Sequence, residues 1–365
     1  MLGTGSHDED LARRSFDRIL LVKPSSLGDV VHALPVLHGL RTRYPNARID
    51  WLCATPFVGL LQDHPDLNEV VPFDRSRFGR LGRSFRVTRD FLRFVGDLRS
   101  RAYDLVIDLQ GLFRSGFLSR ATGAPTRLGF VDAREGAPWF YNHRIAVDGP
   151  DTHAVDRNYK VARLLGFADV PVSFNLALSE AVRAEASERL RRLGLTSSDR
   201  VVAIVPGARW ETKVWYPHRF AETIDELQAA DDVRCVLLGG PDEIALCEKI
   251  AGACRSTPLN LGGKTTLRQL AATLGLADCV LCHDSGAMHV AVALDRPLVC
   301  LIGPTNPRRT GPYGRGDAVL QVQLDCSPCY YRRLEQCPHD HRCMRELDSP
   351  TVASAVRRAL GVERA

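Results

Sequence analysis

The chain lacks any apolar run long enough to cross a membrane, since no segment approaches the ~18–20 residues that a spanning helix needs. Its first fifteen residues, MLGTGSHDEDLARRS, also lack the apolar core of a secretion signal. We therefore expect a cytoplasmic protein in which residues 1–16 form a disordered lead-in. Internal repeats and low-complexity tracts are absent too, which excludes a repeat protein.

Two motifs that would identify a nucleotide site are incomplete. The run Ile19–Leu21 leads into VKPSSLGDVVHALP, which has the form of a first strand turning into a first helix. That turn lacks the three spaced glycines of a dinucleotide-binding loop. The run Gly263-Lys264-Thr265 resembles the end of a P-loop, but position 258 is Pro where that motif needs Gly. Neither motif explains why an acid, Asp29, stands on the first turn of the first helix.

Strand-like and helix-like segments alternate along the chain. Its 365 residues exceed one ordinary core, and 45% hydrophobic with 25% charged residues are typical of a soluble globular protein. The sequence predicts an α/β protein with two largely parallel sheets and a linker at 166–179. In the first half we expect strands at 18–22, 48–53, 69–73, 104–109 and 127–130, and helices at 29–44 and 153–165. In the second half we expect strands at 201–205, 233–238, 278–282 and 298–302, and helices after Pro217, after Pro241, up to Leu274, at 285–294 and at 351–360.

Arginine is concentrated in the segment 75–101. Nine arginines stand there against two acids, and four phenylalanines lie among them. Such a segment attracts phosphate or a negatively charged membrane surface, and the alternative is a solvated loop and helix face. No helix-turn-helix, zinc finger or other nucleic-acid signature accompanies it, so we expect no nucleic-acid partner.

Ligand sites in two-domain α/β proteins lie at the carboxyl ends of the strands, so the loops after strands are the candidates. The loop PGARWETKVWYP places Arg209 and Lys213 beyond the strand at 201–205. The loop LGGPDE puts Asp242 and Glu243 after two glycines. The structural alternative for this loop is a tight turn and nothing more.

The third loop, CHDSGAMH, begins the helix predicted at 285–294. Backbone N–H groups at a helix start form an anion site, here those of Ser285, Gly286 and Ala287. Asp284 alternatively serves as a cap of that helix. Together the three loops outline a nucleotide site with a phosphate end and a ribose end.

Four stretches in this order resemble glycosyltransferase family 9, the lipopolysaccharide heptosyltransferases: VKPSSLGDVVHALPVLHGLRTRYPNARIDWL, PGARWETKVWYPHRFAE, LLGGPDE and CHDSGAMHVAVALDRPLVCLIGPTNPRRTGPYG. The resemblance covers residues 18–360. It implies the GT-B fold, two Rossmann-like domains facing each other across a cleft. The acceptor-binding domain would span 17–170 and the nucleotide-sugar domain 180–348, while a helix at 349–362 would cross back to the first domain.

The resemblance also implies roles for single residues. Asp29 would be the general base, Lys213 would bind the donor's phosphates, and Asp242 or Glu243 would bind the ribose hydroxyls. The pyrophosphate loop would contain Asp284, Ser285, Gly286 and His289. The reaction would be inverting, with ADP leaving from the face opposite the attacking hydroxyl.

The chemistry of these residue types is consistent with the roles that the resemblance implies. A sugar hydroxyl is a weak nucleophile, so a carboxylate that takes its proton helps. Lys213 and backbone N–H groups can stabilise a departing pyrophosphate. The only Asp-x-Asp is Asp8–Asp10, so we expect no metal cofactor in catalysis. Ser25, Ser26, Arg77, Arg80 and Arg83 are the predicted acceptor-binding residues.

The expected partners are ADP-heptose and a phosphorylated acceptor, Kdo-lipid A or heptosyl-Kdo-lipid A, at the cytoplasmic face of the inner membrane. The second heptose transfer is slightly favoured over the first. Two alternatives stay open: a GT-B enzyme that uses another nucleotide sugar, and a non-catalytic nucleotide-sugar-binding protein at the membrane surface.

Four of the eleven cysteines cluster near the C-terminus, at Cys326, Cys329, Cys337 and Cys343. Four thiolates within this stretch, 326–343, could close a structural zinc site. The alternatives are reduced surface thiols or an oxidised pair, because the second pair lacks the usual short spacing. The other seven cysteines are expected to be core thiols.

Overall fold

The computed structural model describes residues 11–149, 151–230 and 233–362. The chain divides into two compact units, Met1–Ala177 and Leu178–Ala365. The division falls inside the stretch 166–179 that the sequence predicts as a linker. No helix among the described residues is both long and apolar enough to pass through a bilayer.

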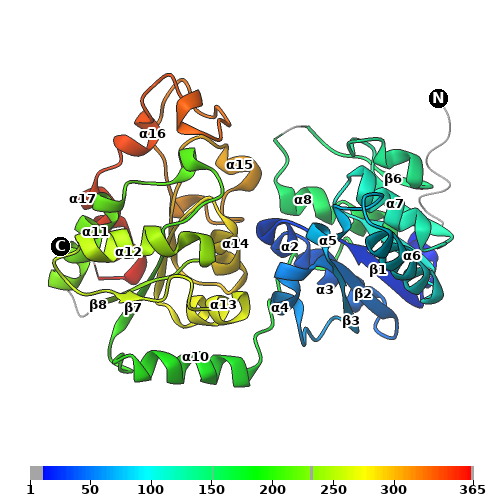
Figure 1. The fold of residues 1–365 in the computed structure, drawn as a ribbon, viewed down its shortest axis with the longest axis horizontal. Helices are drawn as coiled ribbons and strands as arrows, with labels where there is room; N and C mark the ends of the chain where they lie inside the picture. Colours follow the sequence, from blue (N-terminus) through cyan, green and yellow to red (C-terminus); the bar gives the residue numbers. More distant parts are fainter. Residues whose placement is uncertain (1–10, 150, 231–232, 363–365) are drawn as a thin grey trace. The chain divides into compact units, whose positions relative to one another are not determined.

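Unit 1 is built on six strands, all paired in parallel in the order β3-β2-β1-β4-β5-β6. The strands are β1 Arg18–Val22, β2 Arg48–Ala54, β3 Glu69–Phe73, β4 Leu105–Asp108, β5 Thr126–Phe130 and β6 His143–Ile145. The helices are α2 Leu27–Val31, α3 Leu34–Arg43, α4 Val58–Leu61, α5 Arg75–Phe78, α6 Phe85–Ser100, α7 Phe113–Ala121, α8 Ala154–Tyr159 and α9 Val161–Leu165. Contacts of α3 with α8 and α9, and of α6 with α7, form two helical layers (Figure 1).

Unit 2 repeats this topology, with parallel strands in the order β12-β11-β10-β7-β8-β9. The strands are β7 Arg200–Val205, β8 Val233–Leu237, β9 Leu259–Asn260, β10 Cys279–His283, β11 Leu298–Leu301 and β12 Val319–Leu320. The helices are α10 Glu180–Arg192, α11 Pro217–Ala230, α12 Ile244–Ala253, α13 Leu267–Leu276, α14 Gly286–Ala293, α15 Pro307–Thr310, α16 Arg342–Arg345 and α17 Ser349–Leu360. Here α13 contacts α10 and α14, and α11 contacts α12 and α17.

The direction of strand addition reverses once in each sheet, between β1 and β4 and between β7 and β10. At such a switch point the loops that follow the two central strands diverge to opposite faces, and a crevice forms between them. The loop with Asp29 follows β1, and the loop with Lys213 follows β7. Both candidate residues therefore stand where this fold places a ligand.

The predicted helix at 29–44 is wrong in one respect. It consists of two helices, α2 and α3, which are separated at His32–Ala33. Pro35 is the second residue of α3, a position that does not need a backbone N–H, and proline disfavours helical geometry in the residue before it. The predicted helix at 153–165 is likewise split at Lys160 into α8 and α9.

One boundary prediction also needs correction. The sequence predicts a disordered lead-in at 1–16, but residues 11–13 are helical, and Leu11 and Phe16 are buried. Leu11 and Phe16 are apolar side chains, whose burial favours an ordered chain. Residues 1–10 lie outside the described part.

The C-terminal helix packs on elements of unit 2, and its predicted contact with unit 1 stays a prediction. Helix α17 lies against α11, β10 and β11. Its buried residues Val352, Ala353, Ala355 and Val356 belong to the same apolar cluster as Trp215. Because its whole apolar stripe is used there, α17 completes the core of unit 2.

This packing predicts the effect of Val352→Ala. Val352 is fully buried, so removing two methyl groups should lower the free energy of unfolding by about 2 kcal/mol. Thr351→Ala, an exposed change on the same helix, should shift it by no more than about 0.5 kcal/mol. Urea denaturation of both variants tests this, and an unchanged midpoint for Val352→Ala would contradict the assigned packing.

Candidate functional site

The carboxylate of Asp29 is held by the turn after β1. Ser26 is the N-cap residue of α2, and Asp29 stands three residues later. The Ser26 N–H and the Ser26 Oγ both donate to Asp29 Oδ2, at 2.7 and 2.9 Å. Asp29 is thus not the helix cap but the acceptor that fixes the cap residue, and its side chain remains 41% exposed.

A buried lysine lies beside this carboxylate. Lys23 Nζ is 3.4 Å from Asp29 Oδ1 and donates to the Leu109 carbonyl at 2.8 Å. Burial acts to raise the pKa of Asp29, but the Lys23 charge and the hydrogen bonds from Ser26 outweigh it. The pKa of Asp29 therefore lies below its ordinary value, and the group is a carboxylate at neutral pH. The sequence reasoning missed Lys23, although it stands at the end of the same strand.

The loop after β4 supports the Asp29 turn from the neighbouring strand. Asp108 is fully buried, and its Oδ1 accepts the N–H groups of Gln110 and Gly111 at 2.8 and 3.1 Å. Gln110 Oε1 in turn accepts the Ser25 N–H at 3.2 Å. Burial raises the pKa of Asp108, whose Oδ2 accepts from Tyr141 OH at 2.7 Å. Predicted Ser25 and Ser26 thus shape the turn that holds Asp29.

The predicted acceptor arginines fall into two kinds. Arg77, in α5, forms an ion pair with Asp90 of α6 and is therefore partly neutralised. Arg80 and Arg83 are exposed and form no ion pair within the described residues, as is true of Arg86. Arg75 and Arg99 are exposed and also lack an ion pair within the described residues, but Arg80, Arg83 and Arg86 are the unpaired arginines that lie close together in the sequence.

The phenylalanines of this segment serve mainly as its anchor. Phe78 and Phe94 stack around Phe73 of β3, with ring centroids 5.4 and 5.7 Å apart, and Phe78 meets Phe91 at 5.3 Å. Phe85 differs, because 85% of its surface is exposed. We define the arginine surface as Arg80, Leu81, Arg83, Phe85 and Arg86.

In unit 2 three strand-end loops meet at one carboxylate. Lys213, after β7, places its Nζ 2.7 Å from Asp284 Oδ2. Thr305, after β11, donates its hydroxyl to the same Oδ2 at 2.6 Å. Asp284 follows β10 and is buried, and Ser285 rather than Asp284 is the N-cap of α14. The alternative role of Asp284 as a helix cap is therefore wrong.

The Lys213 ammonium keeps donor capacity for a ligand. An ammonium has three protons, and Lys213 directs two contacts to Asp284, one to Oδ2 and one to the backbone carbonyl at 3.2 Å. Its Nζ also lies 4.5 Å from the ring centre of Trp210. Nearby, Ser285 Oγ is buried and has no hydrogen-bond partner within the described residues. An unpaired donor at the start of α14 suits an anionic oxygen.

His283, His289 and Arg209 differ in how deeply their side chains are buried. His283, at the end of β10, is fully buried, and its Nε2 accepts the Trp215 N–H at 2.9 Å. Burial lowers the pKa of His283 to about 3, so its ring is neutral at neutral pH. The sequence reasoning did not single out His283 or Thr305. Predicted His289 lies on the buried side of α14, and predicted Arg209 is exposed in the Lys213 loop.

The two acids of the LGGPDE loop are turned in different directions. Asp242 is exposed, whereas Glu243 is half-buried and accepts the Gly240 N–H at 2.7 Å. Burial raises the pKa of Glu243, the Asp242 carboxylate adds to this and the Gly240 hydrogen bond opposes it. A Cβ at Gly207 would lie 1.6 Å from Glu243 Oε1, so a larger residue there would displace the Glu243 carboxylate. Glu243 therefore lies between the strand-end loops of β7 and β8.

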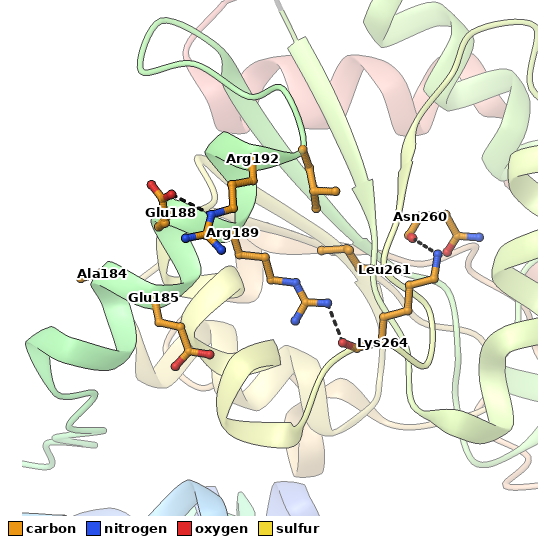
Figure 2. Close-up of a pocket in the computed structure, with 9 residues that line it drawn as sticks. Ala184, Glu185, Glu188, Arg189, Arg192, Asn260, Leu261 and Lys264 are labelled. Atoms are coloured by element: carbon orange, nitrogen blue, oxygen red, sulfur yellow. Dashed lines mark hydrogen bonds and ion pairs between the residues drawn. The ribbon is translucent and has the colours of Figure 1, made fainter.

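A separate cavity of about 790 Å³ lies between α10 and the loop after β9 (Figure 2). Its charged side chains are already engaged: Arg192 pairs with Glu188, Arg189 donates to the Lys264 carbonyl, and Lys264 donates to the Asn260 carbonyl. None of the predicted site residues lines this cavity. It is therefore not the candidate site.

The cysteine cluster lies in unit 2. Each of the four cysteines is a free thiol. Across the described ranges, no group of three or more His, Cys, Asp or Glu side chains is arranged to hold a metal ion. Cys343 packs into the core, where a Cβ at Gly303 would lie 2.8 Å from its Sγ. Burial raises the pKa of the Cys343 thiol to about 11, and the charges of Cys329, Cys337 and Cys326 add to this shift. The structural zinc site stays a prediction.

Comparison with known proteins agrees with this geometry. The family model "Glycosyltransferase family 9 (heptosyltransferase)" matches residues 91–339. Lipopolysaccharide heptosyltransferase 1 of Pseudomonas aeruginosa is 31% identical, with 86% of each chain covered. The lipopolysaccharide core heptosyltransferase OpsX of Haemophilus influenzae is 29% identical over 83% of this chain and 84% of its own.

A solved structure agrees over the whole length. Escherichia coli heptosyltransferase WaaC with ADP superposes with a TM-score of 0.74 at 25% identity, covering 94% of this chain and 99% of its own. The two doubly wound sheets are accordingly those of the GT-B fold. The chain belongs to glycosyltransferase family 9 and is a glycosyltransferase.

Proposed function

We propose that the protein transfers heptose from ADP-heptose to the inner core of lipopolysaccharide, with inversion and without a metal cofactor. The observation that carries the proposal is the pair of switch points, one with an ionised carboxylate and one with a lysine-centred anion site. Family membership and the heptosyltransferase relatives support the donor and the acceptor class. Of the two early heptose additions, the second is our prediction.

Asp29 is the base of the proposed mechanism. Its Oδ2 accepts two hydrogen bonds from Ser26, and its Oδ1 lies 3.4 Å from Lys23 Nζ. The Asp29 side chain is 41% exposed, so the carboxylate can receive a further donor. An acceptor hydroxyl that donates to this carboxylate loses its proton to it as the new glycosidic bond forms. Because the pKa of Asp29 is lowered, the base is ionised throughout the neutral range.

Lys213 stabilises the leaving diphosphate. Asp284 and Thr305 hold the ammonium in place before the donor binds, so little reorganisation is needed. The remaining ammonium proton and the Ser285 hydroxyl then bind oxygens of the diphosphate. These groups supply the positive potential that other transferases obtain from a metal.

Glu243 binds the ribose. Its carboxylate is turned toward the loops after β7 and β8, whereas Asp242 is exposed. Ribose hydroxyls donate to a carboxylate in charge-assisted hydrogen bonds. We therefore propose Glu243, of the two acids that the sequence leaves open, as the ribose-binding residue.

The arginine surface binds the acceptor's phosphates at the cytoplasmic side of the inner membrane. Three unpaired guanidiniums match phosphate oxygens. The exposed ring of Phe85 and the side chain of Leu81 suit the interface between headgroups and acyl chains.

Transfer assays with two acceptors test the function, and one substitution tests the base. Wild-type protein should transfer heptose from ADP-heptose in the presence of EDTA, faster to heptosyl-Kdo-lipid A than to Kdo-lipid A. Asp29→Asn keeps an acceptor for the Ser26 N–H but cannot take a proton, so turnover should fall by about 10²–10⁴-fold while ADP binding is nearly retained.

Asp348→Asn is the matched control for that change. Asp348 caps α17 through the Thr351 N–H, so this variant alters a capping acid outside the site and should transfer heptose at the wild-type rate. Wild-type turnover by Asp29→Asn would disprove its role as base. Stabilisation of the protein by uridine or guanosine nucleotides, without stabilisation by ADP, would disprove the donor.

Glu243→Gln should weaken ADP-heptose binding, by about ten-fold for loss of a charge-assisted hydrogen bond. Asp242→Asn should change the affinity little, because Asp242 is exposed. The raised pKa of Glu243 gives a second test: as the pH falls, Glu243 is protonated before an ordinary carboxyl, and donor affinity should decline correspondingly early. Calorimetric titration with ADP at several pH values measures the affinity of each variant and its pH dependence. An equal loss of ADP affinity in Glu243→Gln and Asp242→Asn would exclude Glu243 as the ribose-binding residue.

Replacing Arg80, Arg83 and Arg86 with Ala should weaken binding to vesicles that contain anionic lipid, and the loss should shrink at high salt. Donor affinity should be unchanged. Arg183 and Arg191 of α10 and Arg200 of β7 are exposed as well, and their triple replacement is the control for lost net charge. Vesicle sedimentation at low and high salt reports the difference, and similar binding by both variants would show that the arginine surface has no specific role.

A further inference from the structure

The segment 326–345, which contains the four clustered cysteines, is in contact with both loops that hold Asp284. Toward the loop after β11, Ser327 Oγ donates to the Gly303 carbonyl at 2.6 Å and the Tyr330 N–H donates to the Pro304 carbonyl at 2.9 Å. These contacts lie beside Thr305, which donates to Asp284. We call residues 326–345 the brace segment.

The brace segment contacts the Lys213 loop more extensively. The Glu211 N–H donates to the Arg332 carbonyl at 3.0 Å, and the Leu334 N–H donates to Glu211 Oε2 at 3.3 Å. The Arg332 guanidinium lies 5.1 Å from the ring centre of Trp210, the same ring that Lys213 Nζ approaches. The loop before Lys213 is therefore bound along its length by backbone and side-chain groups of the brace segment.

The most buried of these contacts involves His341 and the residue directly before Lys213. His341 is 6% exposed, and its Nε2 lies 2.8 Å from the Thr212 carbonyl. A carbonyl only accepts, so Nε2 carries the proton. In the neutral ring Nδ1 is then the acceptor, and Tyr216 OH lies 3.3 Å from it. Thr212 is itself buried and donates its hydroxyl to the Tyr331 carbonyl.

We infer that His341 is a positioning residue for Lys213. Its Nε2–H fixes the carbonyl of the Thr212–Lys213 peptide, and the orientation of that peptide sets the direction in which the Lys213 side chain leaves the backbone. The ammonium then reaches Asp284 and, beyond it, the diphosphate of the donor. The inference rests on the proposed role of Lys213, but the holding of Lys213 itself can be measured without any ligand.

His341→Leu removes the donor and leaves the Thr212 carbonyl buried without a partner, a loss that corresponds to about ten-fold in an equilibrium. His341→Gln keeps an N–H donor of similar reach. His339→Leu is the matched control, since His339 is an exposed histidine of the same segment. Tyr216→Phe removes the second hydrogen bond of the ring and provides an independent variant should His341→Leu fail to fold.

The first measurement is residue-specific acetylation by trace acetic anhydride, read by peptide mass spectrometry without ligand. In the wild type Lys213 should react slowly, because its side chain is 14% exposed and its ammonium is bound by Asp284. Its reactivity should rise several-fold in His341→Leu and less in Tyr216→Phe. The acetylation rate of Lys213 should be close to that of the wild type in His341→Gln and unchanged in His339→Leu. Lys249, which is exposed, is the internal standard. Equal Lys213 reactivity in wild type and His341→Leu would overturn the inference.

The second measurement is steady-state transfer. His341→Leu should lower kcat/KM for ADP-heptose by about ten-fold and leave the acceptor KM unchanged, and His341→Gln should recover most of the loss. A parallel rise in acceptor KM would indicate general damage and would contradict a positioning role. If the wild type does not use ADP-heptose at all, the proposed function fails, while the acetylation experiment still decides the role of His341.

Discussion

One buried carboxylate determines how the strand-end loops of unit 2 are organised. Asp284 receives Lys213 from the loop after β7 and Thr305 from the loop after β11, so loops from three strands share one acceptor. A buried carboxylate without partners would be strongly destabilising, and this requirement holds the lysine in place. The ammonium is thereby ordered before a ligand arrives, which is what electrostatic stabilisation of a leaving group requires.

Unit 1 contains a similar ion pair, in which the buried partner is the cation and the exposed partner is the anion. There a buried lysine, Lys23, lies beneath a half-exposed carboxylate, Asp29. In each unit the buried partner is tied to a neighbouring strand end, Lys23 by the Leu109 carbonyl and Asp284 by Thr305. The group that faces a ligand is therefore oriented by its counter-ion and not by its own backbone alone.

The sequence predicted those features that depend on local pattern. Apolar runs and helix-start residues located β1, β3 and α14 well, and strand-end position was enough to select Asp29, Lys213 and Asp284. It could not reveal Lys23 or His341, because their partners lie 86 and 129 positions away, at Leu109 and Thr212. Cysteine spacing likewise says nothing of Cys343 packing against Gly303. The apolar stripe of α17 shows that this helix packs, but not on which elements.

In the proposed mechanism, the ion pair between Lys23 and Asp29 also constrains the timing of bond changes. A carboxylate with a depressed pKa is a feeble proton acceptor, so it cannot pull a proton from a free sugar hydroxyl, whose acidity is very low. The hydroxyl becomes acidic only once its oxygen has begun to bond to the anomeric carbon. Departure of the nucleotide must then run ahead of deprotonation, and the sugar passes through a state with oxocarbenium character. Stabilisation of the departing nucleotide therefore drives such a reaction, and Asp29 accepts a proton that the acceptor hydroxyl is already releasing.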